Sequence, residues 1–199
     1  MRSTKTIAIA LIAVALIATS ALAVIDGTDH DLRSRLQIDQ ICQPCHAPHN
    51  AIHGYDGPIW NHQIVTRTFT RTDWETGVTE NITLSGSSKL CMSCHDGLTA
   101  VGNFGGISDA TDPITGDAAL DLDFTDDHPI GVEYPSDSHI LRDPAEVANY
   151  LEDGKIECGS CHYAHGGQDD KFLRVTIVNS ELCGVCHTFT YSPAERAEL

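Results

Sequence analysis

The chain is poor in aromatic and basic residues. Of its 199 residues, only 6% are Phe, Trp or Tyr, and 12 Lys and Arg stand against 28 Asp and Glu, which gives a formal net charge of −16. This acidity disfavours nucleic-acid binding, because phosphate binding needs a basic face. With few aromatics, 16 Gly and 8 Pro, the chain has little to fill an interior. A small chain with so poor a core needs disulfides, metals or covalent cofactors to stabilise it.

Residues 1–23 have the pattern of a secretory signal peptide. A basic start precedes an apolar run over 7–18, and Ala21-Leu22-Ala23 fits a cleavage site. The run is short for a membrane-spanning helix. We therefore expect the protein to be exported without a stable membrane span, and residues 24–199 to form a single domain.

Cysteine and histidine are in excess, with 8 and 11 residues. The cysteines form four C-x-x-C pairs, and a histidine directly follows each pair. C-x-x-C-H is the attachment motif of c-type haem, in which two thiols form thioethers with one porphyrin and the histidine ligates its iron. Zinc knuckles or disulfides would not require a histidine after every pair. The predicted attachment residues are Cys42, Cys45, Cys91, Cys94, Cys158, Cys161, Cys183 and Cys186, and the predicted proximal ligands are His46, His95, His162 and His187.

Methionine, the usual alternative to histidine as the second axial ligand, is almost absent. After the leader the chain has only Met92, which lies inside the motif CMSCH and is a poor ligand there. Bis-histidine ligation is therefore expected, and the absence of methionine ligation predicts low-potential haems. Of the seven remaining histidines, four stand in contexts that favour ligation: His49, His62, His128 and His165. The other three, His30, His53 and His139, lie in polar surroundings and are interpreted as solvated.

The motifs form an internal duplication, with copies at about 42–95 and 158–187. Capping and turn residues predict short helices over 30–41 and 144–152. The segment 63–70 alternates as a strand does, and 77–84 is its candidate partner. We expect a fold of coil and short α-helices with little or no sheet, wrapped around a stack of four covalent haems.

In addition, the sequence resembles multihaem c-type cytochromes with doubled CxxCH motifs, and most closely the tetrahaem cytochromes that polymerise into extracellular filaments. The resemblance is carried by the segments 42–50, 58–62, 85–97, 126–134, 155–166 and 181–187. It implies four bis-histidine haems with distal ligands at His49, His62, His128 and His165. It also implies a homopolymer in which His49 ligates a haem of the neighbouring subunit.

These features predict an electron-transfer protein rather than an enzyme. It would pass electrons to other redox proteins or to extracellular acceptors, from the cell surface or the extracellular space. Two alternatives stay open: a soluble periplasmic tetrahaem shuttle, and a multihaem reductase. A reductase needs a haem with an open sixth position, whereas here the histidines are in surplus.

Overall fold

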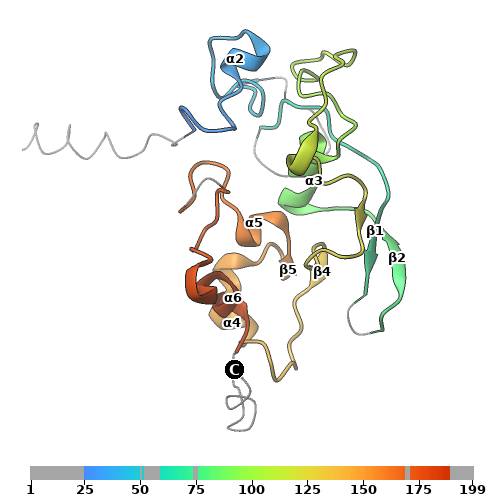
Figure 1. Cartoon of the computed structure of the whole chain (residues 1–199), viewed down its shortest axis with the longest axis vertical. Coiled ribbons are helices and arrows are strands. Elements are labelled where there is room, and N and C mark those ends of the chain that lie inside the picture. Colours follow the sequence, from blue (N-terminus) through green and yellow to red (C-terminus); the bar gives the residue numbers. More distant parts are fainter. Residues whose placement is uncertain (1–24, 50, 52–58, 74–75, 169–170, 189–199) are drawn as a thin grey trace, which may run out of the picture.

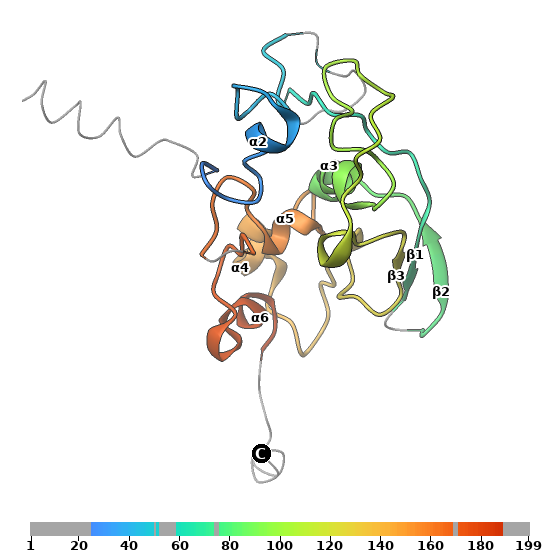
Figure 2. The ribbon, with the colours of Figure 1, turned by 45° about the horizontal axis from the view of Figure 1, so that its top comes forward.

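The computed structural model describes residues 25–49, 51, 59–73, 76–168 and 171–188. The predicted leader over 1–23 and His53 lie outside these residues. Within them, short helices and strands alternate with long stretches of coil (Figures 1 and 2). No helix in this part of the chain is both long enough and apolar enough to cross a membrane.

The helices are short. The α-helices are α2 (Arg33–Leu36), α3 (Gly86–His95), α4 (Pro144–Val147), α5 (Cys158–Cys161) and α6 (Glu181–Cys186), and the 3-10 turns are η2 (Gly116–Ala118), η3 (Ala148–Tyr150) and η4 (Val178–Ser180). The predicted start of α4 is confirmed, because the Asp143 carboxylate accepts a hydrogen bond from the Ala145 amide (2.8 Å) and Pro144 opens the helix. Of the helix predicted over 30–41, only the single turn α2 forms.

The prediction of little or no sheet is wrong, because the chain forms two small sheets. In the first, β1 (Phe69–Thr72) lies between β2 (Thr79–Ile82), which is antiparallel to it, and β3 (Asp123–Phe124), which is parallel to it. In the second, β4 (Val132–Glu133) pairs with β5 (Lys155–Ile156) in antiparallel register. The expected pairing of the segments 63–70 and 77–84 is present in β1 and β2, although β1 begins only at Phe69. The other strands are two residues long, too short for an alternating pattern to reveal them.

A hydrophobic cluster fills the space between the first sheet and α3. It consists of Val65, Phe69, Leu84, Met92 and Phe124, and the Phe69 and Phe124 rings stack with centroids 5.4 Å apart. Met92 is fully buried in this cluster. Its thioether therefore packs against apolar side chains, which agrees with the expectation that it is no axial ligand.

We expect Met92→Ala to lower the free energy of unfolding by about 2–5 kcal/mol, because it leaves a cavity in the cluster. Met92→Leu keeps the volume and should cost less than about 1.5 kcal/mol. Denaturant titrations of the haem-loaded variants, followed by circular dichroism, measure both values. The haem absorption spectrum should be unchanged in Met92→Leu, and a spectral shift there would show instead that the sulfur ligates iron.

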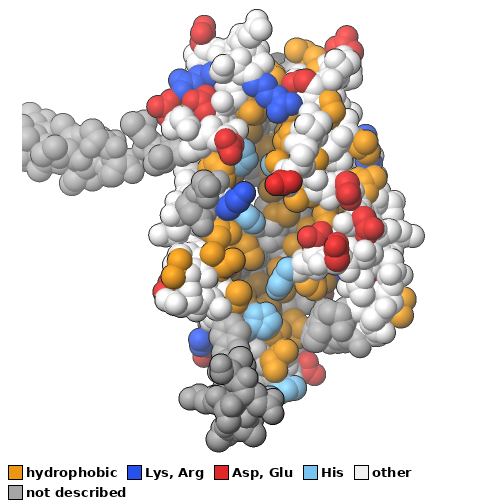
Figure 3. All heavy atoms as spheres, in the orientation of Figure 1, with side chains coloured by type: hydrophobic (Ala, Val, Ile, Leu, Met, Phe, Trp, Pro, Cys, Tyr) orange, Lys and Arg blue, Asp and Glu red, His pale blue; other side chains and the backbone are white. Residues whose placement is uncertain are grey.

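Helices α3 and α5 lie side by side in the middle of the molecule (Figures 1 and 2). The first sheet stands on one side of them, and α4 and α6 stand on the other side. Figure 3 shows histidine side chains following one another down the middle of one face, with hydrophobic side chains beside them. The fold thus brings several histidines, which are spread through the sequence, onto one face of the molecule.

Candidate haem sites

Each C-x-x-C-H motif forms one helical turn. The amide of the histidine donates to the carbonyl of the first cysteine in the motifs at Cys42, Cys158 and Cys183, with N–O distances of 2.8, 2.9 and 2.9 Å. In the motif at Cys91 the same residues lie inside α3. Residues three and four positions apart share a face of a helix. The spacing therefore puts both thiols and the imidazole on one side of the turn, as attachment of one porphyrin requires.

Helix α3 has one buried side and one side that carries the groups of the C-x-x-C-H motif. Met92 and Ser93 are buried on its inner side, whereas Cys91, Cys94 and His95 are only partly buried on the other. The inner side thus anchors the helix in the hydrophobic cluster. The opposite side holds the three groups that would bind haem.

The four motifs are neighbours in the order of the sequence. The Cys94 thiol interacts electrostatically with that of Cys45. The thiols of Cys91 and Cys158 hydrogen-bond to each other. The thiol of Cys161 interacts with those of Cys183 and Cys186. The first motif therefore meets the second, the second the third, and the third the fourth.

The thiols lie in apolar surroundings. Burial is the main cause that raises the pKa of Cys45 to about 11 and that of Cys94 to about 12. Unattached thiols at these positions are therefore protonated at neutral pH. All eight cysteines are free of disulfides.

Three histidines of C-x-x-C-H motifs each face a histidine from elsewhere in the chain. The ring centroids of His46 and His165 are 5.9 Å apart, with planes at 14°. Those of His95 and His30 are 6.1 Å apart at 69°. Those of His187 and His128 are 6.3 Å apart at 87°. Every pair joins one motif histidine to one histidine outside the motifs, and none joins two of the same kind.

These spacings fit one metal ion between each pair. An imidazole nitrogen lies about 2.0–2.1 Å from a metal that it ligates and about 1.1 Å from its own ring centroid, so two imidazoles on opposite sides of one metal have centroids about 6.3 Å apart. The angle between the planes is free, since each ring can turn about its bond to the metal. The observed centroid distances of 5.9, 6.1 and 6.3 Å are close to this value.

Backbone carbonyls orient the rings of two motif histidines. The Nδ1 atom of His95 lies 2.7 Å from the Ala118 carbonyl, and that of His162 lies 2.8 Å from the Lys171 carbonyl. Such a bond fixes Nδ1 as the protonated nitrogen and leaves Nε2 to face a metal. The donor set and its orientation thus fit a haem iron.

Two of the predicted distal histidines, His165 and His128, are the ones that meet motif histidines. The third partner is His30, which the sequence analysis interpreted as solvated. The ring of His30 is partly buried and stacks on Phe172 at 4.4 Å and 20°, which holds it toward His95. Burial also lowers the pKa of His30 and so favours the neutral ring that ligates metals. No local pattern marks His30, because both contacts come from distant parts of the chain.

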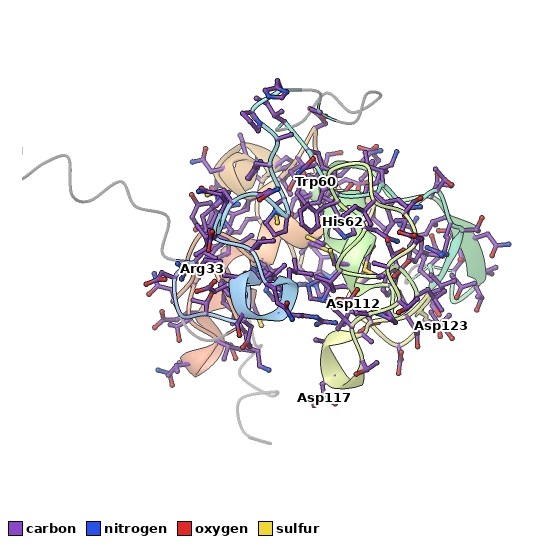
Figure 4. All side chains as sticks on the ribbon, turned by 90° about the horizontal axis from the view of Figure 1, so that it is seen from above. Arg33, Trp60, His62, Asp112, Asp117 and Asp123 are labelled. Carbon is purple, nitrogen blue, oxygen red and sulfur yellow. The ribbon has the colours of Figure 1, made fainter. Side chains whose placement is uncertain are left out.

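The two other predicted distal histidines lie apart from the motif histidines. His62 is buried, with Nδ1 3.2 Å from the Gln63 carbonyl and Nε2 3.2 Å from the Val101 carbonyl; Figure 4 shows it beside Trp60. His49 is exposed. Among the residues that the structure describes, neither His49 nor the motif histidine His162 has a ring contact with another histidine. One motif histidine, His162, is thus left over, and two exposed histidines, His49 and His139, have no ring contact with another histidine among the described residues.

Asp96, directly after the second motif, is a residue that the sequence analysis missed. Its carboxylate is fully buried and accepts hydrogen bonds from Arg67 Nη1 (2.6 Å) and from the Thr99 amide (2.6 Å) and hydroxyl (2.7 Å). This network fixes the chain immediately after His95. Thr99 is close to Asp96 in sequence, whereas only the fold brings Arg67 to it.

Comparison with known protein families agrees with this geometry. Residues 151–190, which contain the third and fourth motifs, match the family model described as the doubled CXXCH motif. No curated protein matches the chain. The match and the C-x-x-C-H motifs indicate a c-type-cytochrome-like protein that binds haem c covalently and transfers electrons.

Proposed function

We propose that this protein is an exported tetrahaem cytochrome that conducts electrons as the subunit of an extracellular filament. The observation that carries the proposal is the pairing of three motif histidines within the chain, while His162 has no imidazole partner among the described residues. The exposed histidines His49 and His139 have none either, and His49 is the one that lies at the repeated position three residues after a motif. In a filament, His49 of one subunit ligates the haem that His162 holds in the next.

The ligand set follows from the histidine pairs. His165 serves the haem at His46, His30 the one at His95, and His128 the one at His187. The duplication supports the fourth pair. His165, three residues after the third motif, faces the first motif, and His49 occupies the equivalent place after the first motif. By this equivalence, His49 is the distal ligand of the haem at the third motif, in the neighbouring subunit. His62, whose two ring nitrogens face carbonyls, takes no part.

If two histidines held each haem iron, no position would be left for a small substrate, which favours electron transfer over reduction of a bound molecule. Haem iron supplies the one-electron chemistry, and the protein contributes ligands, spacing and charge. The order of the motifs, each next to its sequence neighbour, gives electrons a path from one end of the subunit to the other. The excess of carboxylates stabilises ferric haem and supports low potentials.

The leader pattern over 1–23 supports export, and the partners are other redox proteins or extracellular electron acceptors. The second candidate is a soluble periplasmic shuttle. It would need His49, or another histidine of the same chain, to complete the haem at His162.

His49→Ala should abolish filaments while all four haems remain attached. The released monomer should show one high-spin ferric haem, because the third motif has lost its distal ligand. Electron microscopy and size-exclusion chromatography measure assembly, and the visible spectrum measures the spin state. His139→Ala, which also removes an exposed histidine, is the matched control and should assemble normally.

Filaments of normal length from His49→Ala would overturn the ligand exchange between subunits. A wild-type protein that is monomeric with only low-spin haems would favour the soluble shuttle. A substantial high-spin signal in the assembled wild-type protein would favour the reductase.

A further inference from the structure

Glu157 is a buried carboxyl group between the second and third motifs. Only 1% of its surface is exposed. The carboxyl group accepts hydrogen bonds from the Ser85 hydroxyl (2.7 Å, at Oε1) and from the Ser160 amide, whereas Oε2 is buried with no hydrogen-bond partner among the described residues. Leaving a buried polar oxygen unpaired is costly, and more so when the group is charged. The position therefore disfavours a permanent negative charge.

The motif helices on either side hold this carboxyl in place. The Cys158 and Gly159 amides of α5 donate to the Ser88 and Ser87 hydroxyls of α3, with distances of 2.8 and 2.7 Å. The Glu157 amide donates to Ser160 Oγ (3.0 Å) at the start of α5. These contacts join the helix of the second motif to that of the third. Glu157 thus sits between two haem attachment sites and next in sequence to Cys158.

A second carboxyl group lies close by. Glu152 accepts a hydrogen bond from the Ser87 amide (2.7 Å) through Oε2. A side chain at Gly86 would place its Cβ 2.6 Å from Glu152 Oε2 and 3.2 Å from Glu157 Cγ, so both carboxyl groups flank the same glycine. Glu152 is only partly buried and can exchange protons with solvent. Two neighbouring carboxyl groups disfavour ionisation of both, because their charges repel.

The other titratable groups near Glu157 do not neutralise it fully. Lys155 of β5 is the cation that interacts with it, and the Cys158 thiol is the neutral neighbour on α5. Burial raises the pKa of Glu157, and repulsion by Glu152 adds to this, whereas the hydroxyls of Ser88 and Ser85 and the charge of Lys155 lower it. Burial has the largest effect.

We propose that Glu157 is a redox-linked proton site, which takes up one proton when an electron arrives at the second or third haem and releases it when the electron leaves. The proposal rests on the proposed function, since it needs haems at these motifs. For each event, one electron from a one-electron donor converts one ferric ion to ferrous, and one proton from solvent converts the Glu157 carboxylate to the acid. The net charge of the site is then the same before and after.

The direction in which the haem potential changes with pH follows from electrostatics. An added electron repels the carboxylate charge, and in a buried site this repulsion is strong, so reduction makes proton uptake by Glu157 more favourable. By linkage, protonation makes reduction easier. The potential of the linked haem therefore falls as pH rises between the pKa values of Glu157 in the oxidised and reduced states. In a chain with a net charge of −16, such a proton offsets the cost of further negative charge.

The test is a spectroelectrochemical titration of the full haem-loaded protein at a series of pH values from mildly acidic to mildly alkaline. The wild type should show a fall in potential with rising pH, and Glu157→Gln should lose this dependence for the linked haem. The reduced-minus-oxidised infrared difference spectrum should contain a protonated carboxylic acid band that Glu157→Gln lacks. Glu181→Gln is the matched control, because Glu181 is an exposed carboxyl group just before the fourth motif. It should behave as the wild type does.

Potentials that do not vary with pH, or an unchanged dependence and infrared band in Glu157→Gln, would overturn this proposal. The proposed electron transfer would stand in that case, provided the haems are still reduced and reoxidised reversibly. Haems that are absent or fail to cycle would overturn the proposed function itself. Should Glu157→Gln not fold, the infrared spectrum of the wild type remains decisive, since the proposal fails if no acid band appears on reduction.

Discussion

Replacing Cys91 and Cys94 together with alanine is expected to reduce the haem content of the purified protein from four to three. The two thiols and His95 lie on one side of α3, and no other cysteine pair can take over their porphyrin, since each remaining pair belongs to its own motif. Intact-protein mass spectrometry and the pyridine haemochrome assay count the haems that remain.

The same double variant should also be much less stable than the wild type. Losing the porphyrin removes a large apolar group from the interior, and the loss of a large buried aromatic group costs about 3–5 kcal/mol. In a chain of this size 1 kcal/mol corresponds to about 2–4 °C, so the unfolding temperature should fall by about 6–20 °C. The loss affects the centre of the fold, because α3 also carries Met92 into the hydrophobic cluster and contacts α5 through its serines.

Cys183→Ala with Cys186→Ala is the matched comparison. It should also remove one haem, but with a smaller loss of stability, because α6 has no buried residues whereas α3 has four. Equal unfolding temperatures for the two double variants would show that α3 has no special structural role. A haem content of four in either variant would show that its thiols carry no haem.

The motifs could be predicted from the sequence because their geometry is local. Cysteines three residues apart with a histidine directly after them can meet one porphyrin only from a helical turn, and all four motifs form such a turn. The capping signals of α4 are local too, and Asp143 and Pro144 act as expected. The same holds for the hairpin of β1 and β2, whose strands are close in sequence.

The sheets and the core depend on contacts between distant parts of the chain. The sequence pattern therefore did not predict them. Strand β3 joins β1 by pairing Asp123 with Thr70, and strands of two residues carry no periodic signal. The scarcity of aromatics predicted a poor core, yet Phe69 and Phe124 stack within the hydrophobic cluster. A few well-placed rings suffice when a small sheet and a helix enclose them.

The candidate distal histidines also depend on contacts between distant parts of the chain. His165 could be ranked from its place in the repeat and His128 from its neighbours, and the structure brings both to motif histidines. His30 has polar neighbours in sequence, and only folding brings Phe172 and His95 to its ring. His62 has the apolar neighbours of a ligand, and its two ring nitrogens each lie 3.2 Å from a backbone carbonyl, so its ligation stays a prediction.

His30→Ala is therefore expected to convert about a quarter of the ferric haem from low spin to high spin, since one of four irons loses its sixth ligand. The affected haem is the one at His95, whose ring lies 6.1 Å from that of His30. All four haems should stay attached, because no thiol is changed. Electron paramagnetic resonance and the visible spectrum of the assembled protein measure the high-spin fraction.

His62→Ala is the decisive comparison, because His62 and His30 are rival candidates for ligation. The ring of His62 is fully buried, so its loss should cost stability through a cavity and two lost polar contacts, while every haem stays low-spin. The reverse result, with a high-spin haem in His62→Ala and none in His30→Ala, would restore the ligand set that the family resemblance implies. It would also mean that the His62 ring turns away from the Val101 carbonyl when haem binds.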